Sequence, residues 1–258
     1  MFLFFWLLGG MLLAFIILPL VHMVGRQSIT VLQDVSAMPD VRSAIVLSMI
    51  TAVIAAMLAA LGGIPLAYLL ARRRFPLQPV VEAAVDLPLA VPHTVAGIAL
   101  LFVFGRTGPL GQLAGRFGIS FWGTSLGVVT GMLFVSVPYM VNAAREGFEA
   151  VDIRLEKAAR TLGATPAQVF WQVSLPLSWR SILSGMVLTY ARSVAEFGAV
   201  IVLAYYPETA PVKIYELFLS GGLDQSSAAA VLFLTLTLTT FVLFRFLVYR
   251  RASRKESR

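Results

Sequence analysis

The sequence predicts an all-α fold: a polytopic transmembrane helical bundle of about six spans that forms one domain over residues 1–258. First, 59% of the residues are hydrophobic and the mean hydropathy is +0.86, well above the values of an ordinary soluble domain. Second, the apolar residues gather in stretches long enough to cross a hydrocarbon core of about 30 Å as helices. Third, lysine and arginine are concentrated in alternate connectors. The expected spans are residues 2–25, 43–71, 88–104, 121–141, 181–206 and 226–249.

The first apolar stretch, residues 2–25, has two interpretations, a retained span or a cleaved signal peptide. No basic residue precedes Phe2, the apolar run exceeds a typical signal-peptide core of about 7–15 residues, and no small-residue cleavage site follows it. We therefore expect a retained span with a kink at Pro19, followed by a polar connector over residues 26–42.

The second span, residues 43–71, is rich in Ala, Met and Ile. Gly62, Gly63 and Pro65 near its end favour close helix approach or a bend. Three consecutive arginines follow at 72–74, which indicates that this end lies on the cytoplasmic side, together with the connector that follows it.

The third span, residues 88–104, is short and carries Pro88 and Pro92 in its first turns. A proline destabilises a helix least in its first turn, because the first amides of a helix have no intrahelical acceptor. We expect an irregular start to this span and a turn-rich outer loop over residues 105–120 after it.

The last three spans each carry a distinctive feature. Phe121 and Trp122 suit an interfacial belt at the start of the fourth span, which Pro138 is expected to kink or end. The fifth span contains charged residues, and the sixth contains four threonines that can bond within the helix or across to neighbours. Residues 207–225 are expected to form an outer connector.

The distribution of positive charge predicts the topology. The connectors expected inside, including the large loop 142–180 and the chain from residue 245 onward, hold 14 Lys and Arg residues, against 5 in the opposite connectors. By the positive-inside rule, both termini and the large loop are cytoplasmic, and the chain is a multi-pass protein of the cytoplasmic membrane.

The sequence contains none of the common reactive motifs. It has no phosphate-binding loop, no nucleophile elbow and no zinc helix, so we expect neither an enzyme nor an ATP-binding subunit. There is no cysteine, and two distant histidines, His22 and His93, are a poor basis for a metal site, so no metal or cofactor is expected in this chain. The net charge of +7 belongs to the membrane topology, and we expect no nucleic-acid partner.

Residues 155–176, LEKAARTLGATPAQVFWQVSLP, form a polar island inside the large loop. Asp152 is a suitable N-cap for a helix whose apolar residues recur at 155, 158, 159 and 162. Gly163 suits the left-handed backbone after a helix end, and Thr165-Pro166 with Gln168 suits the start of a second helix. The pattern predicts a helix-glycine-helix elbow.

This elbow resembles the EAA loop of ABC importer permeases. The matching positions are Lys157, Ala158, Ala159, Gly163, Val173, Leu175 and Pro176. The family's glutamate is replaced by Lys157, and Glu156 stands one residue earlier. The resemblance implies that the loop enters a cleft on a cytoplasmic ATPase, which would bind ATP and Mg²⁺. The alternative is an amphipathic connector on the membrane surface.

Arg192 and Glu196 lie four residues apart within the fifth span, where each charge at mid-bilayer would cost roughly 2.5 to 3.5 kcal/mol. One interpretation is an internal ion pair or charges that reach the interface. The other is a translocation path in which Arg192 offsets the charge of an anionic substrate. His93 and Thr94, after Pro92, are candidates for the same path or for a structural role.

Three further segments, residues 85–105, 132–148 and 191–207, resemble permeases of molybdate and tungstate ABC importers. The resemblance implies a type I importer permease that pairs with a second copy of itself, two copies of the ATPase and an extracytoplasmic oxyanion-binding protein. Sulfate/thiosulfate permeases share the layout and are the nearest alternative. An ATP-independent anion channel and a membrane-bound enzyme are the rival classes.

Overall fold

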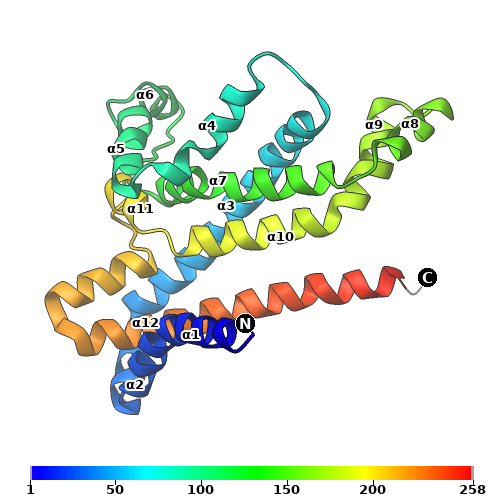
Figure 1. Ribbon diagram of the computed structural model, residues 1–258. Coiled ribbons are helices and arrows are strands. Elements are labelled where there is room, and N and C mark those ends of the chain that lie inside the picture. Colours follow the sequence, from blue (N-terminus) through cyan, green and yellow to red (C-terminus); the bar gives the residue numbers. More distant parts are fainter. Residues whose placement is uncertain (1, 257–258) are drawn as a thin grey trace.

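The computed structural model describes residues 2–256 and, within them, the side chains of residues 2–244 and 246. The described chain is helical with no strand, as predicted. The helices are α1 Phe2–Gly25, α2 Ile29–Ala37, α3 Pro39–Arg72, α4 Gln78–Ala90, α5 His93–Phe104, α6 Pro109–Gly115, α7 Ser125–Glu149, α8 Ile153–Thr161, α9 Pro166–Val169, a π-helical turn Phe170–Ser174, α10 Leu175–Val194, α11 Gly198–Leu203 and α12 Ala210–Glu256 (Figure 1).

Four helical segments are long and apolar enough to cross a membrane: Phe2–Gly25, Pro39–Arg72, Ser125–Glu149 and Ala210–Phe244. The chain bends by 116° between α4 and α5, and if this pair is counted as one broken span, the described chain has five. The expected fifth span, residues 181–206, corresponds mainly to α10, which is not among them because its serines, threonine and arginines lower its hydropathy. The polytopic helical bundle is confirmed, and the number of spans is approximate.

The expected connectors are largely helical, which corrects the sequence interpretation. Residues 26–42 hold α2 and the start of α3, residues 75–87 lie mostly in α4, and residues 105–120 contain α6. These segments are polar enough to suggest loops, yet apolar residues of α2 and α4 pack on the bundle. In α2, for example, Val31, Leu32 and Val35 pack against a cluster that includes Ala228 of α12.

The expected ends of the last three spans also differ from the structure. Pro138 lies inside α7, which continues beyond residue 141 to Glu149. The fifth span is interrupted after Val194, and α11 follows. Residues 210–221, expected in the outer connector, form the first part of α12, and the chain doubles back at Gly222, where φ is +74° (Figure 1).

The centre of the bundle is formed by α3, α7 and α10, which lie side by side (Figure 1). Helix α3 presents fully buried alanines, among them Ala52, Ala55 and Ala59. Small side chains let helices approach closely, and packing rather than the hydrophobic effect holds helices together inside a bilayer. Figure 1 also shows that α8 and α9 stand at one end of this group and α5, α6 and α11 near the other.

Helices α5 and α11 are in near backbone contact through a glycine. A Cβ atom added at Gly97 would lie 2.8 Å from Cβ of Val202 and 2.9 Å from the carbonyl oxygen of Ala199. The second of these atoms belongs to the backbone, so it cannot move away cheaply. This close approach packs the short α11 directly against the middle of α5.

We expect Gly97→Ala to lower the stability of the protein by about 1 to 3 kcal/mol, because the added methyl group overpacks this contact. The matched control is Gly62→Ala in α3, where a Cβ would meet nothing within 4 Å. That control should be neutral or up to about 1 kcal/mol more stable, because alanine is the better helix former. Thermal unfolding of both variants in detergent provides the comparison, and equal midpoints would contradict the predicted contact.

Candidate functional site

The elbow forms as the sequence predicts. The Asp152 carboxylate accepts the backbone N–H of Arg154 at 2.9 Å at the start of α8. Gly163 has φ +89°, in the left-handed region. Thr165 and Gln168 form a reciprocal capping box at the start of α9, with distances of 2.8 and 3.3 Å. These local bonds cap the two helices of the elbow and form the turn between them.

The elbow differs from the prediction where it leaves toward the bundle. Pro176 is the second residue of α10 and follows the π-helical turn directly, and because it has no N–H it cannot donate to the preceding turn. Helix α9, the π-helical turn and α10 follow one another without a break from Pro166 to Val194. The second half of the expected loop 142–180 is therefore the beginning of a long rod.

A buried ion pair attaches the elbow to the bundle. Glu156 is only 7% exposed, and its Oε1 accepts Nε–H of Arg72 and the hydroxyl of Ser174, both at 2.8 Å. Arg72 also donates to the carbonyl oxygen of Val151 at 3.1 Å. Because Arg72 ends α3 and Ser174 precedes α10, one carboxylate joins α8 to two central helices.

An aromatic cluster supports the same junction. The ring of Tyr68 meets Phe148 and Phe170 edge to face, with centroids 5.2 and 4.9 Å apart. Edge-to-face contact at this distance is favourable beyond the area that the rings bury. The rings come from α3, α7 and the π-helical turn, so the base of the elbow rests on all three.

The motif residues that the sequence singled out fall into two groups. Lys157, Ala158, Gly163 and Pro176 are exposed, whereas Ala159, Val173 and Leu175 are half-buried. Leu155 and Leu162 are 49% and 88% exposed, so the apolar side of α8 faces away from the bundle. Sequence reasoning missed Arg72 and Ser174 as partners of Glu156. The only signal was the run of arginines at 72–74, which we interpreted as a topology marker alone.

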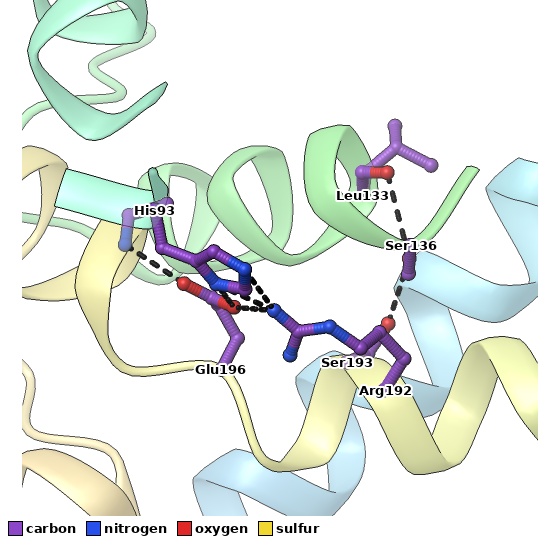
Figure 2. A network of polar contacts seen from close by, with 7 residues as sticks. His93, Leu133, Ser136, Arg192, Ser193 and Glu196 are labelled. Atoms are coloured by element: carbon purple, nitrogen blue, oxygen red, sulfur yellow. Dashed lines mark hydrogen bonds and ion pairs between the residues drawn. The ribbon is translucent and has the colours of Figure 1, made fainter. Parts of the chain in front are cut away.

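A second polar network brings together three of the four predicted pathway residues (Figure 2). Oε2 of Glu196 lies 2.7 Å from Nη2 of Arg192 and 2.8 Å from Nδ1 of His93. Nη2 of Arg192 also lies 3.0 Å from Nε2 of His93. The Glu196 side chain is fully buried, whereas 42% of the His93 side chain is exposed. Thr94 is exposed and takes no part in this network.

The network lies where two spans are interrupted. His93 begins α5 after the 116° bend, and Glu196 lies in the break between α10 and α11. Oε1 of Glu196 accepts the backbone N–H of Ala199 at 2.8 Å. Helix breaks leave backbone groups without intrahelical partners, and a buried carboxylate supplies one. The break between α10 and α11 leaves an amide that needs an acceptor, and the buried Glu196 carboxylate is that acceptor.

A serine pair, which sequence reasoning missed, continues the network toward α7. The hydroxyl of Ser193 donates to that of Ser136 at 2.9 Å, and both residues are fully buried (Figure 2). Two serines amid apolar residues give no pattern that would reveal their pairing in sequence.

The charges in this network balance within the chain. Arg192, near the end of α10, is paired with Glu196 in the break that follows, as the ion-pair interpretation expected. An anion that approaches Arg192 must therefore compete with the Glu196 carboxylate for the guanidinium group. No group of three or more acidic, histidine or cysteine residues suited to a metal ion occurs in the described chain.

A third charged cluster lies at the opposite end of α3 from the elbow. Nζ of Lys213 lies 3.3 Å from Glu208, 2.5 Å from Glu216 and 3.8 Å from Asp40. Burial raises the pKa of the Glu208 carboxyl above its ordinary value, although the charge of Lys213 opposes this shift. The cluster joins the beginning of α12 to that of α3.

These features define a multi-pass α-helical membrane protein with an anchored elbow at one end and a polar network at two helix breaks. The family model of the binding-protein-dependent transport system inner membrane component matches residues 63–258. The chain belongs to this family and is an ABC importer permease.

Individual relatives agree with this assignment. The molybdate/tungstate transport system permease protein WtpB of Thermococcus kodakarensis is 42% identical over 95% of this chain and 94% of its own. A probable sulfate transport system permease protein of Chlorokybus atmophyticus is 32% identical over 89% of this chain and 82% of its own. A bacterial alginate ABC transporter, solved with an alginate-bound periplasmic protein, shares the fold with a TM-score of 0.75 at 17% identity, over 95% of this chain and 94% of its own.

We expect Glu156→Ala to loosen the elbow, because it leaves Arg72 without its carboxylate and removes the acceptor of Ser174. Breaking a buried pair costs about 3 to 5 kcal/mol, so hydrogen exchange of the amides at 153–174 should accelerate strongly. Lys157→Ala is the matched control, since Lys157 is exposed and should leave exchange unchanged. Similar exchange in both variants would rule out the anchoring role.

Proposed function

We propose that this chain is the transmembrane subunit of an ATP-driven importer for molybdate or tungstate. The observation that carries the substrate class is the 42% identity, over nearly the whole chain, to a protein named as a molybdate/tungstate permease. We assign the chain no cofactor of its own and place ATP and Mg²⁺ on the partner ATPase.

The elbow is the proposed ATPase contact. Its exposed motif residues, Lys157, Ala158 and Gly163, are available to a partner, while Glu156 ties it to α3 and α10. A device that transmits force must move with the helices it drives, and a buried anchor supports that role better than a flexible linker. Closure of two ATPase copies would draw two elbows together and open the spans outward, and hydrolysis would reset them.

The remaining partners follow from the same proposal. We infer a homodimer with the pathway between the two copies, and an extracytoplasmic protein that delivers the oxyanion. The alginate transporter, which was solved with a substrate-bound periplasmic protein, supports the latter by analogy of fold.

We propose that both termini and the elbow are cytoplasmic, as the charge bias predicts. The contacts support this topology because they join segments expected on the same side. Arg72 pairs with Glu156, and α4 meets the end of α7 through Glu82–Arg145 at 3.0 Å. On the other side, Gln27 donates to Ser227 at 2.9 Å. The tail from residue 250 onward, whose basic residues contribute to the bias, lies outside the described side chains.

We propose that the polar network of His93, Arg192 and Glu196 borders the translocation path, with His93 and Arg192 partly exposed, Glu196 buried behind them and Thr94 exposed beside them. Support comes from the partial exposure of His93 and from the coincidence of charge with two helix interruptions. Charged residues within membrane spans usually face a pathway or a protein partner.

Sulfate is the second candidate substrate, because a probable sulfate permease is 32% identical over 89% of the chain. Sulfate, molybdate and tungstate are tetrahedral dianions, and the delivery protein would make most of the selection. An ATP-independent anion channel is the remaining rival.

Reconstitution with the partner ATPase and binding protein distinguishes these functions. We expect binding protein loaded with molybdate or tungstate to stimulate ATP hydrolysis, and sulfate-loaded protein to stimulate it weakly. If only the sulfate-loaded binding protein stimulates ATP hydrolysis, the substrate is sulfate and not molybdate or tungstate. Lack of stimulation by all three, or anion flux through this chain without ATP, would overturn the proposal.

The same system tests coupling through the elbow. We expect Gly163→Pro to insert normally into the membrane while ATP hydrolysis no longer drives uptake, because proline fixes φ near −65° and Gly163 requires +89°. Pro176→Ala, within the exposed part of the motif, should remain coupled. Normal uptake by Gly163→Pro would remove the elbow from the mechanism.

A pathway role for Arg192 predicts that Arg192→Ala assembles with its partners but transports the oxyanion at least about tenfold more slowly, which corresponds to about 1.4 kcal/mol. Glu196→Gln is the companion variant, since it keeps the shape of the network and removes the competing charge. Unchanged uptake by a folded Arg192→Ala protein would leave the network with a structural role only.

A further inference from the structure

The exposed side of α8 carries three basic residues and no acidic residue. Arg154, Lys157 and Arg160 follow one another at three-residue spacing, and all three are exposed. Within the described chain, none of these side chains forms an ion pair. The three charges therefore have no acidic counterpart among the side chains that the structure describes.

The only acidic residue inside α8 is turned the other way. Glu156 is 7% exposed, and its Oε1 accepts hydrogen bonds from Arg72 and Ser174. At about 100° per residue, Arg154 and Ala158 lie opposite Glu156. Seen along the helix axis, Lys157 and Arg160 lie on one side of the line from Glu156 to Arg154, and Leu155 and Leu162 lie on the other. The outward surface of α8 thus has an apolar strip beside a basic strip.

The apolar strip beside the basic strip is suited to contact with another protein. Stable protein contacts have an apolar centre with charged residues at the rim, and complementary charge fixes the register. Leu162, at the tip of the elbow, is 88% exposed, and Figure 1 shows the tip at the far end of α8 and α9 from the central helices. An apolar residue at such a tip is best explained by a pocket that receives it.

Resting on the proposed function, we infer that the ATPase cleft that receives α8 is acidic: it carries carboxylates opposite Arg154, Lys157 and Arg160 and an apolar pocket for Leu155 and Leu162. Glu156 makes no contact with the ATPase and acts as the internal anchor of the elbow. The departure at Lys157 is therefore a reversal of charge at the contact and not a loss of the contact.

The test measures binding of the purified partner ATPase to the full-length chain in nanodiscs of zwitterionic lipid. We expect Lys157→Glu to weaken binding about tenfold, because it places like charges opposite each other. The wild-type affinity should also fall as salt rises. The matched control is Arg116→Glu, the same charge change at an exposed residue of the outer loop, which should bind as the wild type does.

A charge swap identifies the partner group. Acidic residues of the ATPase cleft are changed to lysine one at a time, and one of them should restore binding of Lys157→Glu. If the wild type binds and Lys157→Glu binds equally well, the inference is wrong while the proposed function stands. If the wild type does not bind the ATPase at all, the proposed function itself fails.

Repeating the measurement in nanodiscs that contain anionic lipid distinguishes contact of the basic strip with the ATPase from contact with the membrane surface. An effect of Lys157→Glu that appears only there would assign the basic strip to the membrane surface and overturn the inference. Hydrogen exchange over 153–174 that matches the wild type confirms that the variant elbow is folded.

Discussion

The structure depends on one buried carboxylate. Glu156 satisfies an arginine at the end of α3 and a serine at the start of α10, and no other described side chain joins all three segments. Taking these charges out of water is costly, and the cost is recovered only when the partners are held in good geometry. The aromatic rings beneath the elbow and the caps of α8 and α9 provide that geometry. The contacts of Glu156 with Arg72 and Ser174 therefore form only when the elbow is folded, and once formed they fix the elbow to the bundle.

The anchored elbow and the polar network are the two ends of one continuous helical rod. From Ser174, the partner of Glu156, α10 runs without interruption to the turn that holds Arg192. Its 20 residues extend about 30 Å. Under the proposed function, a displacement of the elbow would reach the network without an intervening break in the helix. The first interruption in this path lies at Ala195–Phe197, where Glu196 bonds both His93 of α5 and the amide of Ala199 in α11. Motion would be absorbed at this point.

The sequence predicted those features that depend on neighbouring residues. The N-cap at Asp152, the left-handed Gly163 and the capping box at Thr165 each need only a few residues, and all three were correct. The apolar stretches likewise identified α1, α3 and α7. The helices inside the connectors were not predicted, because a short amphipathic helix such as α2 is stabilised by the surface it covers, and that surface is far away in sequence. The partners Arg72 and Ser174 were missed for the same reason, since they lie 84 and 18 residues from Glu156.

The position of Lys157 shows how tertiary contact decides the meaning of a motif. Spacing alone aligns Lys157 with the first motif residue and leaves open whether Glu156, about 100° away on the helix, could replace it. The rotation of α8 is fixed by the Arg72 pair, which turns Glu156 inward and Lys157 outward. Had α8 been rotated by one residue, a lysine would face Arg72 and an acidic residue would face outward. Like charges at that junction would exclude the arrangement, so the buried pair determines which charge the elbow can offer to a partner.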